Sequence, residues 1–227
     1  MIKDQPGWIN DIIEKVKPFT LTSEERIAAL CNSVAYVVRW NIPGSIVECG
    51  VWKGGSMMAA ALTLQHCGAS DRGLYLFDTF AGMTAPSAND TRARDGVAAS
   101  EIMANAAPDH GIFCFCPLEE VVQNVSSVGY PAHLVHYVKG DVAHTLPGSA
   151  PAQIALLRLD TDWYDSTKHE LETCYPRLSA GGVLIVDDYG HWEGAGKATD
   201  EFVEAATSPI LLNRIDYTGR LAVKVAA

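Results

Sequence analysis

The chain has 227 residues, 48% of them hydrophobic, and 17 Lys and Arg against 27 Asp and Glu give a net charge of −10. This length suits one domain with a full core, and the negative charge argues against a partner that is nucleic acid or a membrane surface. No apolar run approaches the ~20 residues of a membrane span. No signal-peptide pattern opens the chain, and its six cysteines lack paired CxxC spacing, so we expect reduced thiols in a cytoplasmic protein.

Helix and strand patterns alternate along the chain. Residues 1–40 are expected to form an N-terminal helical cap, in which 21–40 is a helix because apolar residues recur at helical spacing behind a potential N-cap, Ser23. The run "GSIVECG" (44–50) predicts a strand, and "GGSMMAAALTLQH" (54–66) predicts a helix. Further strands are predicted at 73–80, 133–141, 154–162 and 181–190, and further helices at 117–127, 164–177 and 196–206.

The end of the chain predicts two more strands joined by a short turn at Thr218-Gly219. Strands that alternate with helices imply an α/β fold: a doubly wound, mostly parallel sheet of seven strands with helices on both faces. The terminal hairpin would be its one antiparallel part. Residues 81–116 carry few strand signals and many small or polar residues, which is typical of a mobile lid or loop. We expect residues 1–227 to form a single domain.

The glycine-rich turn after the first strand, "VECGVWKGGS" (47–56), indicates a ligand site. Gly50 permits a tight turn, and Gly54 lets the backbone approach a ligand. The stretch is neither a GxGxxG dinucleotide fingerprint nor a GxxxxGK[ST] phosphate loop. Glu48 lies just before the turn, which disfavours a phosphate and suits a cationic or hydroxyl-bearing ligand.

A second acid, Asp78, ends the next strand, where such folds commonly bind ribose hydroxyls. Because S-adenosylmethionine has a ribose and a cationic amino-acid end but no phosphate, the two acids favour it over NAD. A role as a helix cap or loop acid is the alternative for Asp78. The stretch at Gly140 and Asp141 is expected to border the adenine. The predicted cofactor-binding residues are Glu48, Gly50, Gly54, Ser56, Asp78, Gly140 and Asp141.

Acidic residues also end the fourth and fifth strands. Asp160 follows the fourth, and Asp187 and Asp188 follow the fifth, so the three carboxylates meet at one edge of the sheet if these strands are neighbours. Oxygen ligands in this number suit Mg²⁺, with Mn²⁺ or Ca²⁺ as alternatives. The competing interpretation is that the Asp187–Asp188 pair only begins a turn. Asp162 is expected to orient its neighbours or touch the cofactor's edge, and Asp165 to serve the start of the next helix.

Several blocks of the sequence, in the same order, resemble the macrocin O-methyltransferase family. They are "VECGVWKGGS", "LYLFDTFAGM", "VKGDVAHTLP", "LDTDWYDST", "YPRLSAGGVLIVDDYGHW" and "GAGKATDEF", and the resemblance covers roughly residues 21–225. It implies a class I methyltransferase fold, S-adenosylmethionine as methyl donor, and Mg²⁺ held by Asp160, Asp187 and Asp188. It also implies a homo-oligomer, a dimer, and a small-molecule acceptor whose hydroxyl belongs to a sugar moiety of a natural product. Residues 81–116 depart from the family pattern.

The expected reaction is transfer of a methyl group to an acceptor hydroxyl whose pKa a metal ion lowers. Asp160 is the first candidate for the base that takes the proton, and His191 is the second, although it suits a plain loop histidine equally well. A catechol-type methyltransferase is an alternative, but there the residue at Asp188 is typically Asn. A cofactor-binding module without catalytic activity is the remaining alternative.

Overall fold

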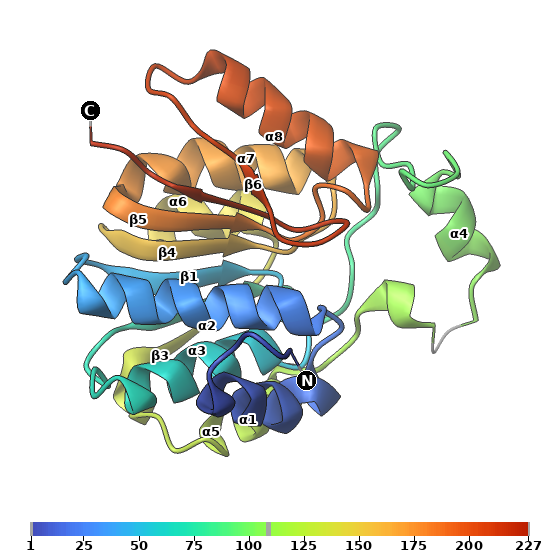
Figure 1. Cartoon of the computed structure of the whole chain (residues 1–227). Coiled ribbons are helices and arrows are strands. Elements are labelled where there is room, and N and C mark those ends of the chain that lie inside the picture. Colours follow the sequence, from blue (N-terminus) through green and yellow to red (C-terminus); the bar gives the residue numbers. More distant parts are fainter. Residues whose placement is uncertain (1, 108–109, 227) are drawn as a thin grey trace.

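The computed structural model describes residues 2–107 and 110–226, which form a seven-stranded sheet in the order β3-β2-β1-β4-β5-β7-β6 (Figure 1). All neighbouring strands are parallel except at β7, which runs antiparallel to both β5 and β6. This confirms the predicted α/β sheet and its terminal hairpin. The strands are β1 (Ser45–Cys49), β2 (Leu74–Asp78), β3 (Val135–Lys139), β4 (Ile154–Leu159), β5 (Leu178–Val186), β6 (Asn213–Arg214) and β7 (Arg220–Val223).

Helices cover both faces of the sheet, and each face has its own apolar core. One face carries α1 (Gly7–Val16), α2 (Glu24–Arg39), α3 (Gly55–His66) and α5 (Leu118–Ser126). The other carries α6 (Val142–Ser149), α7 (Tyr164–Cys174) and α8 (Glu193–Ala205). Single 3₁₀ turns lie at Lys17–Phe19, Ala132–Leu134 and Tyr175–Arg177. Among the helices described, none is long and apolar enough to cross a membrane.

Of the two N-terminal helices, α2 packs against β4 and β5 of the sheet, and α1 packs against α2 and α3. α2 runs alongside the strands in the view of Figure 1, and its first turn is capped by Ser23, whose side chain accepts a hydrogen bond from the backbone N–H of Arg26. The predicted N-cap is therefore confirmed. This capped end of α2 lies at the same edge of the sheet as the carboxyl ends of the parallel strands, because Arg26 pairs with Asp187.

Strand alternation sets which side chains face α2. Ile46 in β1, Leu156 in β4 and Ile185 in β5 belong to the core beneath α2. Two positions further along, this apolar row continues as Glu48 and Arg158, which are paired in register across β1 and β4. Both are buried, so two opposite charges occupy places that the pattern of the sheet would give to hydrophobic residues.

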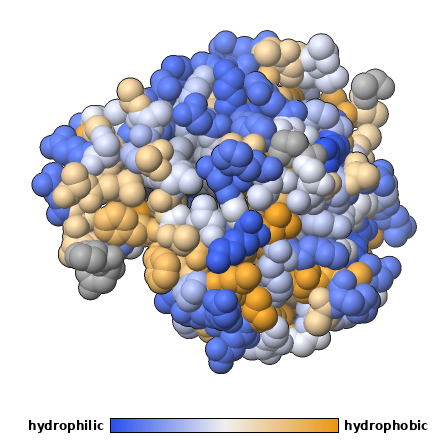
Figure 2. Space-filling view, turned by 180° about the vertical axis from the view of Figure 1, so that it is seen from behind, coloured by the Kyte–Doolittle hydropathy of each residue, from blue (hydrophilic) through white to orange (hydrophobic). Residues whose placement is uncertain are grey.

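The described residues of segment 81–116, which are 81–107 and 110–116, form a projection beside the carboxyl ends of the strands, at the right of Figure 1. It contains α4 (Ala99–Asn105) and a 3₁₀ turn at Gly111–Phe113, neither of which the sequence pattern indicates. An antiparallel bridge between Arg92 and Trp192 joins it to the loop before α8. In the view from behind, this projection lies at the left and many of its surface residues are hydrophobic (Figure 2). Its mobility stays a prediction.

Candidate active site

A cavity of about 400 Å³ opens at the carboxyl ends of the parallel strands, which is where open α/β sheets bind their ligands. Most residues predicted from the sequence line it: Gly50, Ser56, Asp78, Gly140, Asp141, Asp160, Asp187, Asp188 and His191. Glu48 and Gly54 do not line it. The sheet therefore brings together residues that lie far apart along the chain, because β2, β1, β4 and β5 are neighbours.

Asp78 organises the turn that follows β1. Its Oδ2 accepts hydrogen bonds from the backbone N–H groups of Val51 at 2.7 Å and Trp52 at 3.1 Å. Its Oδ1 accepts a third from the backbone N–H of Phe80 at 2.7 Å. Asp78 therefore does stabilise the loop, which is the alternative role predicted for it. The hydroxyl of Thr79 lies 3.4 Å from Oδ1 but is closer, at 2.6 Å, to the carbonyl oxygen of Gly82. One of the carboxylate's roughly four acceptor sites therefore remains for another hydroxyl donor.

Gly50 has a backbone conformation and surroundings that admit no side chain. Its φ is +82°, and a Cβ there would lie 1.9 Å from the carbonyl oxygen of Asp160. The β1 turn and the end of β4 therefore touch through backbone alone. Substituting a larger residue would push apart the two segments that carry the glycine turn and the first acid of the site.

We expect Gly50→Ala to lower the free energy of unfolding more than a matched change elsewhere. Gly68 is the control, because its φ is +69° and a Cβ there would meet nothing within 4 Å. Gly68→Ala should cost only the left-handed backbone penalty, about 1–2 kcal/mol. Gly50→Ala should cost roughly 2 kcal/mol more because of the clash. Urea unfolding measures both, and equal losses would contradict the close approach at Gly50.

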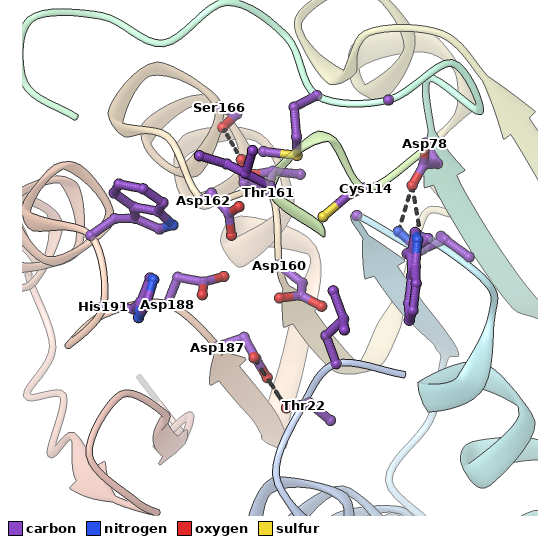
Figure 3. A pocket seen from close by; sticks show the side chains of 18 of the residues that line it. Thr22, Asp78, Cys114, Asp160, Thr161, Asp162, Ser166, Asp187, Asp188 and His191 are labelled. Atoms are coloured by element: carbon purple, nitrogen blue, oxygen red, sulfur yellow. Dashed lines mark hydrogen bonds between the residues drawn. The ribbon is translucent and has the colours of Figure 1, made fainter. Parts of the chain in front are cut away.

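Three carboxylates form a cluster that suits a divalent cation. Asp160, Asp187 and Asp188 each place an oxygen so that all three lie within 4.8 Å of one another (Figure 3). Burial, together with the neighbouring carboxylates, raises the pKa of Asp160 and Asp188 well above the usual range. The Oδ2 of Asp188 is buried and has no hydrogen-bond partner in the described part of the chain. An orphaned carboxylate oxygen in such a cluster fits a hard cation such as Mg²⁺.

Two arginines that the sequence reasoning missed lie among these acids. Nη1 of Arg158 is 2.7 Å from Asp160 Oδ2, and its Nη2 pairs with Asp187. Arg26 pairs with Asp187 from the other side, and its Nε is 3.0 Å from Asp216 Oδ2. The sequence does contain an indication for Arg158, because a charged residue inside the apolar run before Asp160 needs a partner of opposite charge. The sequence contains no such indication for Arg26, because its contact with Asp187 depends on how α2 packs on the sheet.

Glu48, expected to bind the cofactor, is instead bonded to Arg158. Its side chain is 1% exposed, and its Oε1 lies 2.7 Å from Nη1 of Arg158. Burial raises the pKa of Glu48 to about 7, although Arg158 opposes this shift. The acid before the glycine turn therefore lies beneath the cavity, where it faces a cation of the protein itself.

Asp162 also lies near the cluster, and its expected role of orienting its neighbours or touching the cofactor's edge stays a prediction. Its φ is +67°, and its carboxyl group lines the cavity on the side where Asp188 lies (Figure 3). Burial raises its pKa to about 7. It forms no ion pair within residues 2–107 and 110–226. Asp165 is exposed in the first turn of α7, as predicted.

His191 lines the cavity near Asp188. Its Nδ1 is 3.2 Å from the hydroxyl of Tyr217, and its ring lies edge-on to Trp192 at 5.0 Å between centroids. Burial and nearby arginines lower its pKa, so its ring is neutral at neutral pH and has a nitrogen able to accept a proton.

Segment 81–116 supplies the opposite wall of the cavity. Met83, Ile102 and Ile112 bring apolar side chains to it, and Cys114 brings a thiol that points toward the acids (Figure 3). Burial raises the pKa of Cys114 well above its usual range, so the thiol stays protonated. Arg92 and His110 of the same segment also line the cavity, so this wall combines apolar side chains with polar and cationic ones.

The strand order, the glycine turn after β1 and the cavity above it define a class I methyltransferase fold. The chain belongs to the macrocin-O-methyltransferase (TylF) family, whose model matches residues 14–223. The resemblance drawn from the sequence blocks is therefore confirmed.

Two individual relatives of the chain are also named as O-methyltransferases. The chain is 35% identical over 170 residues to 8-demethyl-8-(2,3-dimethoxy-alpha-L-rhamnosyl)-tetracenomycin-C 4'-O-methyltransferase of Streptomyces olivaceus, covering 75% of this chain and 62% of the relative. It is 31% identical over 183 residues to demethyldecarbamoylnovobiocin O-methyltransferase of Streptomyces niveus, covering 81% and 67%. The match thus spans less than two thirds of the first relative. The structure of the O-methyltransferase NovP superposes with a TM-score of 0.79 at 28% identity, covering 92% of this chain and 83% of that one.

Proposed function

We propose that the protein is an S-adenosylmethionine-dependent O-methyltransferase that methylates a hydroxyl, most simply a sugar hydroxyl, of a small natural product. The observation that carries this proposal is one cavity that joins a glycine turn to the acidic cluster of Asp160, Asp187 and Asp188. Family membership supports the reaction type, and the names of the relatives support the acceptor class. The small molecule would be the partner, and the expected homodimer stays a prediction that light scattering measures.

The cofactor would occupy the side of the cavity formed by the glycine turn. Ser56 lines the cavity in the first turn of α3, and the N-terminus of a helix favours a carboxylate such as that of the methionine moiety. Asp78 remains the proposed acceptor for ribose hydroxyls. Gly140 and Asp141 lie beyond it along the same wall, as the proposed border of the adenine.

The acidic cluster would hold a divalent cation, Mg²⁺ in our proposal, through Asp160, Asp187 and Asp188. When bound, such an ion supplies the positive charge that lowers the pKa of the acceptor hydroxyl. Segment 81–116 excludes water from the opposite side with its apolar side chains.

We propose Asp162, rather than Asp160, as the group that takes the proton. Asp160 has one oxygen on Arg158 and belongs to the cluster that would hold the metal. Asp162 lines the same cavity without an arginine partner in the described residues. His191 lies on the same wall and is proposed to orient the acceptor.

Calorimetry and a transfer assay test this function. We expect the protein to bind S-adenosylmethionine, and to transfer its labelled methyl group to a glycosylated tetracenomycin-type or novobiocin-type acceptor in the presence of Mg²⁺. Catechol is the control acceptor and should remain unlabelled. Methylation of catechol alone would favour the catechol-type alternative. Failure to bind S-adenosylmethionine would exclude both enzymatic interpretations.

A further inference from the structure

Arg158 is a buried charge at a position where the sheet would otherwise place an apolar side chain. Its side chain is only 3% exposed, and Leu156 occupies the equivalent place two residues earlier in β4. Desolvating a guanidinium costs several kcal/mol, so a buried ion pair is weak evidence for stability. The burial of Arg158 at this place therefore points to a role other than stabilising the fold.

The guanidinium of Arg158 joins three carboxylates at once. Nη1 lies 2.7 Å from both Glu48 Oε1 and Asp160 Oδ2, and Nη2 pairs with Asp187. Glu48 does not line the cavity, and its second oxygen is buried without a hydrogen-bond partner in the described chain. The only ion pair that Glu48 forms there is with Arg158, so its charge serves to hold this arginine in place.

This arrangement fixes two of the three acids of the cluster relative to each other. A planar guanidinium presents its N–H groups in a rigid fork, which a lysine cannot reproduce. Asp160 and Asp187 end neighbouring strands, and as like charges they would otherwise turn apart. Because Asp160 uses Oδ2 toward Arg158, its Oδ1 is left for another cation. By contrast, both oxygens of Asp187 pair with arginines, Oδ1 with Arg158 and Oδ2 with Arg26.

We infer that Arg158, anchored by Glu48, is a positioning residue that orients Asp160 and Asp187 as ligands for the divalent cation. This inference rests on the proposed metal site. For a variant without Arg158, this inference predicts the opposite change in cation affinity from the one expected if Arg158 only repelled the cation. If Arg158 acted only as a nearby positive charge, its removal would strengthen cation binding. If it positions the ligands, its removal weakens binding although the local charge becomes more negative.

The double variant Glu48→Leu/Arg158→Met separates these two effects. It removes one negative and one positive charge, so the net charge of the protein is unchanged. Asp160 then has no arginine partner in the described chain and Asp187 keeps Arg26 alone, so the melting temperature without metal should fall, and circular dichroism checks that the variant is folded. We expect the affinity for Mn²⁺ alone, measured by electron paramagnetic resonance of free Mn²⁺, to fall at least tenfold (~1.4 kcal/mol). Mg²⁺ calorimetry repeats the measurement.

Arg72→Met is the matched control, because Arg72 binds the backbone carbonyl oxygens of Ile42 and Gly44 at the opposite end of the sheet. It should leave Mn²⁺ affinity unchanged. Mn²⁺ affinity within twofold of wild type, or tighter, in the double variant would overturn the inference. If the double variant does not fold, Arg158→Lys decides instead, because it keeps the positive charge but not the planar fork; a loss of at least threefold is expected, and an unchanged affinity would overturn the inference. Absence of Mn²⁺ binding by the wild type would instead overturn the proposed metal site.

Discussion

Replacing Asp188 by Asn is expected to lower kcat/KM for methyl transfer roughly 10³-fold, which corresponds to about 4 kcal/mol of transition-state stabilisation. Asp188 has a buried oxygen without a partner in the part of the chain that the structure describes, and it belongs to the cluster of three acids. Asn keeps the shape but removes the charge. EDTA should cause a comparable loss in the wild type, and added Mg²⁺ should restore activity in the wild type only.

Asp165→Asn is the control for this change. Asp165 lies in the same acidic stretch of the sequence, but it is exposed in the first turn of α7 and does not line the cavity. Its replacement should leave kcat/KM within about twofold, as is usual for surface substitutions. Methyl transfer that survives both EDTA and Asp188→Asn would exclude the metal site, and the acids would then be interpreted as partners of Arg26 and Arg158.

The meeting of the three acids could be predicted from the sequence because it depends on local pattern and a simple topology. Apolar runs define the strands, and acids that end two parallel neighbours share one edge of the sheet. β4 and β5 are indeed neighbours, so Asp160 and Asp187 come together. The tight turn at Gly50 could also be predicted from the sequence, because a glycine at a strand end indicates special backbone geometry.

The partners of these acids could not be predicted in the same way. Arg26 and Asp187 are 161 residues apart in the chain, and their contact is set by the packing of α2 on the sheet. The glycine turn beside Glu48 predicts a cofactor contact, whereas strand alternation directs its side chain toward the face that carries α2. Helix α6 is also not predicted from the sequence, because its stretch contains Pro147 and Gly148, two residue types that disfavour a helix.

The position of Asp162 depends on one backbone angle, a positive φ that no pattern signals for an aspartate. That turn brings its carboxyl group into the cavity beside Asp188, where it can accept the proton of an acceptor hydroxyl. We expect Asp162→Asn to lower kcat by about 10²–10⁴-fold, the range typical of a lost general base. Affinity for Mn²⁺ should stay within about twofold, because Asp160, Asp187 and Asp188 remain in place.

His191→Gln is the matched variant, because His191 lines the same wall and was the second candidate for the base. Gln retains a polar group near the hydroxyl of Tyr217 but cannot take up a proton at neutral pH. We expect a loss of less than about tenfold in kcat, with a rise in KM for the acceptor, because an orienting group acts mainly on binding. A larger loss of kcat in His191→Gln than in Asp162→Asn would reverse the assignment and make the histidine the base. A loss of Mn²⁺ binding in Asp162→Asn would instead make Asp162 a fourth ligand of the cation.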